Sequence, residues 1–379
     1  MKLPPFLLDR WIEQKHTADP PIEFDLASST GPVWKLRELL ALSGENPLES
    51  LLDSNVSYTN ATGTPALRTA IAKLEGVDPD EVQVTTGASE ALLLLFFLAA
   101  EPGANVVFPN PGFPSNATLA ESLGIEVRYY TLRAENQFRV DVDEIRKLMD
   151  GNTRLLLVNS PHNPTGAVLS DGEIQSLHDL CAERGVQFVS DQVYHPIYHG
   201  PRMRSAARLP HATVISDFSK ALCLSGLRIG WIVDRDPARR ERYHNARNHF
   251  TICANVFGEK LAVLALEHSD KIYARASQVA QANLALLDQF FAQHQGLLRW
   301  LKPSGGMTAF PWLADGSDTR EFCRRLAKKG VLIVPGDCFG QPSHFRLGFA
   351  ASGERFPLAI ERFAEFLHAE SRQRSTVSA

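Results

Sequence analysis

Short runs of apolar residues, rich in β-branched and aromatic side chains, recur between about residues 82 and 233, and helical patterns separate them. The strand candidates are 82–85, 105–108, 125–130, 155–159, 186–191, 213–217 and 229–233. These runs lack a strict alternation of apolar and polar positions, which indicates strands buried on both faces. Strands of this kind, alternating with helices, predict an α/β domain with a mostly parallel seven-stranded sheet between helices.

The pattern changes after about residue 255. Long helical stretches continue to about residue 295, and the strand candidates that follow are 307–313, 331–334 and 345–349. This order predicts a second, smaller α+β domain. We expect a large domain over 46–260 and a small domain over 261–379 that begins with an interdomain helix. The N-terminal segment 1–45 is expected to complete the small domain.

Composition and charge limit the possible functions. The chain has 379 residues, of which 44% are hydrophobic and 22% charged, values typical of folded proteins rather than disordered or fibrous ones. Lys and Arg number 39 against 43 Asp and Glu, so the net charge is −4. This balance offers no basic surface for nucleic acid or an anionic membrane. Chemistry on a small molecule is therefore the first expectation.

The five cysteines are scattered and form no C-x-x-C pair, so neither a disulfide framework nor a zinc site is predicted. The N-terminus lacks the apolar core of a signal peptide, and we expect a cytoplasmic protein. The longest apolar run, 91–100, is about half the ~20 residues that a membrane span needs. It predicts a buried helix instead.

Polar residues with chemical potential follow several predicted strands, at the edge where α/β sheets bind ligands. Asn163 lies in the turn after one strand, Asp191 and Tyr194 follow the next, and Lys220 follows a third. Each alone is typical of a turn, a helix cap or a surface lysine. A Schiff-base lysine needs partial burial near cations, and Arg228 supplies a cation that would also bind a phosphate. Because all of these residues follow predicted strands, one after another along the chain, together they predict a catalytic site.

This ordered set resembles the class I/II aminotransferases of fold type I, which depend on pyridoxal 5′-phosphate (PLP). The matching segments are YTNATGTPALRTAIA (58–72), TTGASEA (85–91), PNPGFP (109–114), NSPHNPTG (159–166), DQVY (191–194), SKALCLSGLRIGW (219–231), SGGMTAF (304–310) and FRLGF (345–349). The resemblance implies an enzyme that acts on an L-amino acid, with a 2-oxo acid as the amino acceptor.

The resemblance also implies roles at the cofactor ring. Lys220 would hold PLP as a Schiff base and then carry a proton between the substrate Cα and the cofactor. Asp191 would keep the pyridine nitrogen protonated, so that the ring accepts electrons. Asn163 and Tyr194 would bind the 3-hydroxyl oxygen, and Phe113 would stack on the ring.

The cofactor phosphate is expected at the N-terminus of the helix that begins near Ala88 and Ser89, where free N–H groups favour an anion. Arg228 adds a positive charge. The family usually has Ser or Thr three residues before the lysine, but this chain has Asp217 there. An anion beside a phosphate is unfavourable unless it points away or pairs with Arg228. We expect Ser219 or Ser216 to take the missing role.

Substrate and partner residues follow from the same resemblance. Arg346 would bind the substrate α-carboxylate with its two guanidinium N–H groups, helped by Asn163. By period two it faces away from the apolar side of its strand. Ser29 lies in the loop that would close over the substrate. Tyr58 would reach the phosphate of a neighbouring subunit, which implies a homodimer with shared active sites.

Several segments resemble the capreomycidine synthase-like members of this family. They are LLDRWIEQK (7–15), PHNPTGAV (161–168), SGGMTAFPWL (304–313) and VLIVPGDCFGQ (331–341). Such enzymes eliminate a side-chain hydroxyl and cyclise a guanidino amino acid, in secondary metabolism. Their Asp-x-x-Tyr motif lacks the tyrosine, and the presence of Tyr194 therefore favours transamination. A guanidinium would need a carboxylate, for which Asp9 and Glu13 are candidates.

Two other interpretations carry less weight. A non-catalytic PLP-binding regulator domain would need a DNA-binding domain, but fewer than 50 residues precede the α/β domain. His195 and His199 have the i, i+4 spacing of metal ligands on a helix, but Pro196 lies between them and no third ligand is evident. We expect no metal site.

Overall fold

The computed structural model describes residues 3–44 and 47–377, with side chains described up to residue 372. Within these residues a sheet of seven strands has the order β2-β8-β7-β6-β5-β3-β4. The strands are β2 (Val82–Thr85), β3 (Asn105–Asn110), β4 (Glu126–Thr131), β5 (Thr153–Asn159), β6 (Gln187–Asp191), β7 (Ala212–Asp217) and β8 (Gly230–Asp234). Only β8 runs antiparallel to its neighbours. The predicted α/β fold with a mostly parallel sheet is confirmed.

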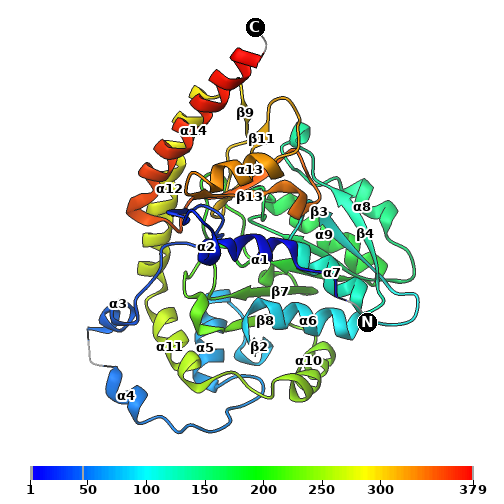
Figure 1. Cartoon of the computed structure of the whole chain (residues 1–379). Helices are drawn as coiled ribbons and strands as arrows, with labels where there is room; N and C mark the ends of the chain where they lie inside the picture. Colours follow the sequence, from blue (N-terminus) through cyan, green and yellow to red (C-terminus); the bar gives the residue numbers. More distant parts are fainter. Residues whose placement is uncertain (1–2, 45–46, 378–379) are drawn as a thin grey trace.

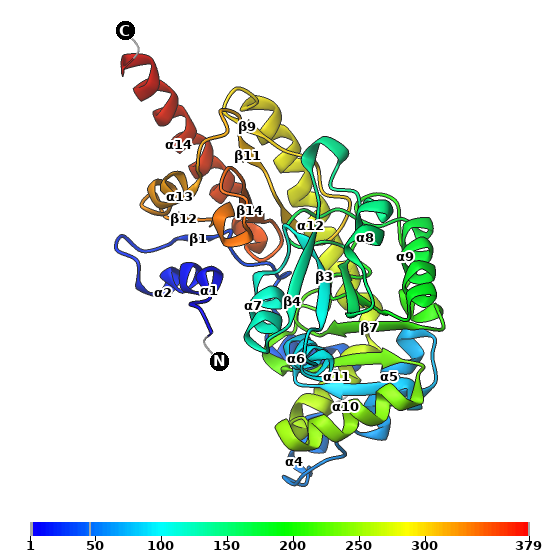
Figure 2. The same ribbon diagram turned by 90° about the vertical axis from the view of Figure 1, so that its right-hand side faces the viewer.

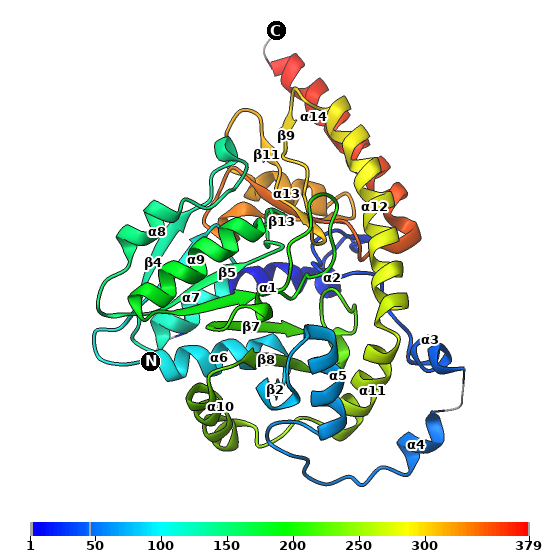
Figure 3. The same ribbon diagram turned by 180° about the vertical axis from the view of Figure 1, so that it is seen from behind.

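Helices cover both faces of this sheet, as the apolar strands require. Neighbouring residues such as Leu155 and Leu156 belong to two separate hydrophobic clusters, one on each face. One cluster includes α6 (Gly87–Ala99), α7 (Pro114–Ser122) and α10 (Pro237–Phe250). The other includes α5 (Pro65–Glu75), α8 (Val142–Leu148) and α9 (Asp171–Arg184), which Figure 3 shows on the near side of the molecule.

The C-terminal part is built on two long helices, α12 (Ser269–Gln293) and α14 (Phe356–Val377), which lie side by side in Figures 1 and 3. Helices α11 (Val256–Glu267) and α13 (Arg320–Ala327) accompany them. A small sheet joins β10 (Thr308–Ala309), β14 (Phe345–Gly348) and β13 (Val334–Pro335), and β9 (Leu298–Arg299) pairs with β11 (Trp312–Leu313). The predicted smaller α+β unit is therefore present.

The N-terminal segment lies against this C-terminal part. Its elements are α1 (Leu7–Ile12), α2 (Gln14–Thr17), β1 (Phe24–Asp25), α3 (Leu36–Leu40) and, after the break at 45–46, α4 (Leu48–Leu52). Strand β1 pairs in parallel with β12 (Val331–Leu332), and Trp11 Nε1 donates to the Ile333 carbonyl at 2.7 Å. Figure 1 shows α1 between the small strands and the central sheet, and Figure 2 shows it at the outer side of the molecule, below β1. The predicted boundary at 45/46 lies outside the described residues.

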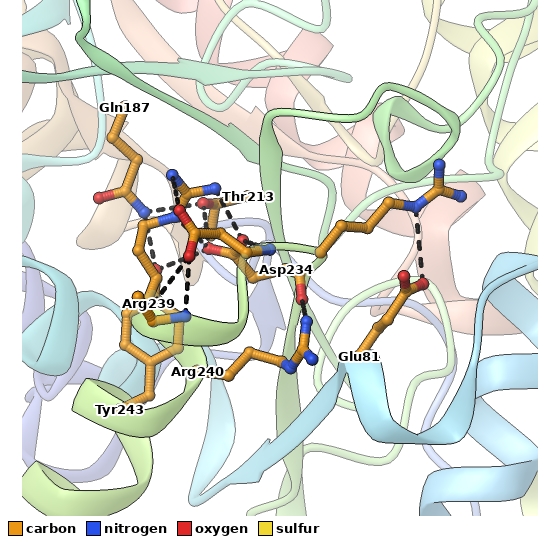
Figure 4. Close-up of polar contacts among 10 residues, drawn as sticks. Glu81, Gln187, Thr213, Asp234, Arg239, Arg240 and Tyr243 are labelled. Atoms are coloured by element: carbon orange, nitrogen blue, oxygen red, sulfur yellow. Dashed lines mark hydrogen bonds and ion pairs between the residues drawn. The ribbon is translucent and has the colours of Figure 1, made fainter.

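A cluster of charged and polar side chains fastens α10 to the sheet, at the edge where the parallel strands begin (Figure 4). Asp234 is fully buried and accepts two hydrogen bonds from Arg239, both at 2.8 Å. Thr213 and Tyr243 also donate to it at 2.8 Å, and Gln187 bonds both of these partners. Because its donors are all in place, this carboxylate is compensated within the chain.

Membrane insertion finds no support among the helices. In the part of the chain that the structure describes, no helix is both long and apolar enough to cross a bilayer.

Candidate active site

The carboxyl ends of three neighbouring strands meet at the opposite edge of the sheet. Asn159 ends β5 and Asp191 ends β6, and these two residues are partners in the parallel register. The Asn159 side chain accepts from the Asn163 N–H at 2.7 Å and donates to the Asp191 carbonyl at 3.2 Å. Asn159 therefore places the predicted residue Asn163 beside Asp191. Asn159 was not among the predicted site residues, although it is the last residue of a predicted strand.

Asp191 is 8% exposed, and its side chain accepts the Val193 N–H at 3.1 Å. Burial raises the pKa of this carboxyl to about 7, and the nearby charge of Asp217 adds to the rise while Lys220 opposes it. A charged N–H group placed against the carboxylate would offset the cost of its burial.

Lys220 and Tyr194 converge on one residue of the N-terminal segment. Lys220 follows β7, is half-buried, and donates from Nζ to the Ser29 hydroxyl oxygen at 3.2 Å. The Tyr194 hydroxyl donates to the Ser29 carbonyl at 3.0 Å. Asp25 orders this loop, because its carboxylate accepts from the Ser28 N–H and hydroxyl at 3.0 and 2.7 Å. Ser29 thus lies directly over the lysine, although the two residues are far apart in sequence.

Arg346 is 1% exposed, so it is not on a solvated strand face. Its Nη1 donates to the Asn163 Oδ1 at 3.2 Å, and its Nη2 donates to the Ala27 carbonyl at 2.7 Å. The guanidinium lies over the Phe339 ring at 5.1 Å, and its Nε has no partner among the described residues. Burial lowers the pKa of Arg346. Because no carboxylate of the described part of the chain forms an ion pair with it, the group is suited to bind an anionic ligand.

The N-terminus of α6 forms a narrow cradle with Arg228. A Cβ at Gly87, whose φ is +75°, would lie 2.8 Å from the Arg228 Nη2, and a Cβ at Gly230 would lie 2.8 Å from the Ala88 nitrogen. Only glycine therefore permits this approach. Ser89 is exposed in the first turn of α6. Free N–H groups and a guanidinium at one place make an anion site.

Asp217 ends β7 inside this cradle and is buried. Its carboxylate accepts the Ser219 N–H at 2.8 Å, the Ser219 hydroxyl at 2.7 Å and the Ala88 N–H at 3.4 Å. Arg228 donates to the Ser219 oxygen at 3.5 Å, so the link between Arg228 and Asp217 runs through that hydroxyl. The Ser216 hydroxyl donates to the Gln192 carbonyl at 3.4 Å.

Phe113 and Tyr58, the two aromatic residues expected at the cofactor, differ in how far they are buried. Phe113 is half-buried, and the ring of Phe6 meets it edge-on with centroids 5.9 Å apart. The N-terminal segment therefore reaches this aromatic, a contact that no sequence pattern indicated. Tyr58 is 80% exposed, on a segment anchored by Glu259, which accepts the Thr64 N–H at 2.7 Å. Tyr58 thus lies on the surface of this chain.

The two histidines with metal-like spacing are engaged elsewhere. His195 Nδ1 lies 2.6 Å from the Tyr198 hydroxyl, and His199 Nε2 lies 2.8 Å from the Gly306 carbonyl. Among the described residues, no group of three His, Cys, Asp or Glu side chains could hold a metal ion.

Asp9 on α1 lies within electrostatic reach of the same site. Burial and the neighbouring Glu13 raise the pKa of Asp9, while the positive charges of Lys220 and Arg346 act to lower it. Helix α1 therefore presents a carboxylate toward the two cations that Ser29 and Ala27 contact.

Comparisons with known proteins show the family of the chain. The family model for aminotransferase class I and II matches residues 35–363. Capreomycidine synthase of Streptomyces vinaceus is 32% identical over 99% of this chain and 97% of its own length. A PLP-dependent aminotransferase from Streptococcus suis superposes with a TM-score of 0.90 at 30% identity, covering 97% of this chain and 99% of that one. The PLP-dependent cyclase OrfR superposes with a TM-score of 0.88 at 28% identity, covering 98% of both chains.

Proposed function

Because the chain belongs to the aminotransferase class I and II family, we propose that it transfers the amino group of an L-amino acid to a 2-oxo acid. The chain is a PLP-dependent enzyme, as its family and its structural neighbours imply.

The residues at the carboxyl edge fit PLP. The buried carboxylate of Asp191 suits a protonated ring nitrogen, which would lower the raised pKa of Asp191. The glycine cradle at α6 with Arg228 suits the phosphate, and Lys220 supplies the amine that binds the aldehyde. When bound, PLP supplies an electron-accepting ring that stabilises negative charge at the substrate Cα. Phe113, Asn163 and Tyr194 would hold the ring in place.

One observation carries the assignment of the substrate. Lys220 and Arg346 both contact the loop of residues 27–29, through the Ser29 hydroxyl and the Ala27 carbonyl. An α-carboxylate bound by Arg346 would therefore bring its Cα close to the Lys220 amine, which takes up and returns the Cα proton. Ser29 would cover the substrate from the N-terminal side. This arrangement suits α-amino acids of any side chain.

The reaction is tested by its need for an acceptor. The loaded enzyme is incubated with single amino acids, with and without added 2-oxo acid, and products are identified by mass. Transamination predicts one 2-oxo acid per site without an acceptor and continued turnover with one. Continued turnover without an acceptor would contradict the proposal. No turnover with any amino acid would favour a regulator that binds PLP without catalysis.

A second candidate is elimination and cyclisation of a hydroxylated arginine-like substrate, and the position of Asp9 favours it. Asp9 lies within electrostatic reach of the two cations of the site, and Glu13 lies one helical turn from Asp9, so a positively charged side chain would find a carboxylate there. Capreomycidine synthase and the cyclase OrfR are relatives whose names fit such a reaction. With hydroxyarginine, this candidate predicts loss of water over many cycles without an acceptor.

A pair of variants separates the substrate class from the reaction. Asp9→Asn is expected to raise KM for a guanidino substrate about tenfold or more, since a hydrogen bond to a charged group is lost. A neutral amino acid should be unaffected. Glu13→Gln is the matched control, with a smaller effect on the same substrate. If, for each substrate, the wild type and the two variants had the same KM, Asp9 would have no part in substrate binding.

We also infer a homodimer with shared sites. Tyr58 is largely exposed, and so are the apolar side chains of Leu52, Val56, Ile252 and Phe257. Figures 1 and 3 show α4 and the chain after it projecting below α11. Mixing inactive Tyr58→Ala and Lys220→Ala subunits should restore activity, because one site in each hybrid has both residues. No recovery despite subunit exchange would contradict the shared site.

The remaining organisation is inferred in the same way. The pairing of β1 with β12 supports a small domain built from 1–45 and 261–379, with 46–260 as the large domain. The five cysteines are free thiols, which supports a reducing compartment such as the cytoplasm. A melting profile of the separately expressed large domain would test the division.

A further inference from the structure

Asp217 occupies the place where the cofactor phosphate is expected. Its carboxylate accepts the Ala88 N–H at 3.4 Å, at the N-terminus of the 13-residue helix α6. The same helix end, with Arg228 beside Gly87, is the anion cradle described above. A carboxylate and a phosphate would therefore share one set of donors.

The hydroxyl groups of Ser219 and Ser216 do not relieve this competition. Ser219 donates its proton to Asp217 at 2.7 Å and accepts from Arg228 at 3.5 Å, so its hydroxyl serves the carboxylate. The Ser216 hydroxyl donates to the Gln192 carbonyl. The hydroxyl protons of Ser219 and Ser216 are thus directed to Asp217 or away from the cradle.

The charges around Asp217 do not cancel a second anion. Arg228 and Lys220 are the nearby cations, while Asp191, on the adjacent strand, is a further carboxylate whose pKa the charge of Asp217 helps to raise. On α6, Glu90 is bonded to the Thr86 N–H and paired with Arg247 at 3.4 Å. A doubly ionised phosphate beside ionised Asp217 would therefore be repelled at short range in a largely buried place.

We propose that Asp217 couples cofactor binding to the uptake of one proton, which the phosphate and the Asp217 carboxylate then share. The proton comes from solvent and leaves when PLP dissociates. A protonated pair has one negative charge fewer, and the proton forms a hydrogen bond between the two groups in place of the repulsion. Because the free phosphate loses its second proton near pH 6, this uptake acts from about pH 7 upward. Alkaline conditions would therefore release PLP from this enzyme.

Equilibrium dialysis of PLP against the apoprotein between pH 7 and 9 tests the proposal. The Kd of the wild type should rise by about tenfold per pH unit more than that of Asp217→Asn, since one proton is taken up in the first and not in the second. At pH 8.5 the variant should bind at least about tenfold more tightly. Pyridoxal, which lacks the phosphate, should give the same pH dependence in both proteins.

Two further variants separate charge from hydrogen bonding. Asp217→Ser should reproduce the effect of Asp217→Asn, whereas Ser219→Ala keeps the carboxylate and should keep the wild-type slope. The ³¹P resonance of bound PLP should indicate a singly ionised phosphate at pH 7.5 in the wild type and a doubly ionised one in Asp217→Asn. Equal slopes in wild type and Asp217→Asn would overturn the proposal. Failure to bind PLP at any pH would instead contradict the family's cofactor at this site.

Discussion

Two buried aspartates end strands of the same sheet at opposite edges, and their surroundings differ. Asp234 receives hydrogen bonds from Arg239, Thr213 and Tyr243, all at 2.8 Å. Asp191 receives the Val193 N–H at 3.1 Å, and its pKa is raised to about 7 by burial. The first carboxylate is satisfied by the chain itself. For the second, we propose that the cofactor supplies the partner.

The direction of the strands explains the difference. Strand β8 runs antiparallel to β7, so Asp234 emerges at the edge where the parallel strands begin, next to the start of α10. Its partners Arg239 and Tyr243 are only five and nine residues further along the chain. Asp191 emerges at the ligand-binding edge, where loops leave the sheet. Because β8 runs in the opposite direction, we expect Asp234 to act in stability and Asp191 in function.

The largest expected effect at the ligand-binding edge comes from Lys220→Ala. We expect activity to fall by about 10³-fold or more, because the amine that binds PLP and carries the proton is lost. Stability should change by only about 1 kcal/mol, since one hydrogen bond of Lys220 is recorded. Borohydride reduction and peptide mass mapping should find PLP on Lys220 in the wild type. Labelling of another lysine would contradict the site.

At the edge where the parallel strands begin, we expect a loss of stability without a loss of activity. Asp234→Ala should cost about 3–5 kcal/mol of unfolding free energy, because the buried Thr213 and Tyr243 hydroxyl groups and Arg239 all lose the carboxylate that accepts their hydrogen bonds. The kcat of the folded fraction should remain near that of the wild type. Asp236→Ala is the control, since the more exposed Asp236 caps the same helix at 2.8 Å from the Ala238 nitrogen and pairs with Arg239 at 3.2 Å, and its loss should cost about 1–2 kcal/mol. A loss of kcat without loss of stability in Asp234→Ala would break the comparison.

A smaller effect is expected from Tyr194→Phe. The phenol would bind the anionic 3-oxygen of PLP, and losing one hydrogen bond to a charged group should lower activity about ten- to a hundred-fold. Asp191→Asn should cost far more, because the ring nitrogen then loses the carboxylate that keeps it protonated. Single-turnover exchange of the Cα proton measures both variants. Equal losses would show that Asp191 acts as an ordinary hydrogen-bonding residue.

The sequence predicted the sheet and the identity of the polar cluster because both depend on local patterns. All seven candidate runs are strands, and the residues that follow three of them meet at one edge. Chain order was sufficient for Asn163, Asp191 and Lys220, since parallel strands place their carboxyl ends together.

Features that depend on distant segments could not be predicted in this way. Period two placed Arg346 away from the apolar side of its strand, but the loop near Ala27 covers that side and buries the guanidinium. The direction of the Ser219 hydroxyl, toward Asp217, depends on how the β7 end meets α6. The contact of Phe6 with Phe113 joins α1 to a loop more than a hundred residues away.

The unfolding free energy of the apoprotein between pH 4 and 8 tests the difference between the two aspartates most directly. An Asp191 pKa of about 7 in the folded chain, against about 3.9 when unfolded, stabilises the fold below pH 4 relative to neutral pH. The unfolding free energy of the wild type minus that of Asp191→Asn should therefore fall by about 1.4 kcal/mol per pH unit as the pH rises toward 7. Saturating PLP should abolish this slope in the wild type. A difference that stays constant with pH in the apoprotein, or one that PLP leaves unchanged, would contradict the assignment of Asp191 as the carboxylate completed by the cofactor.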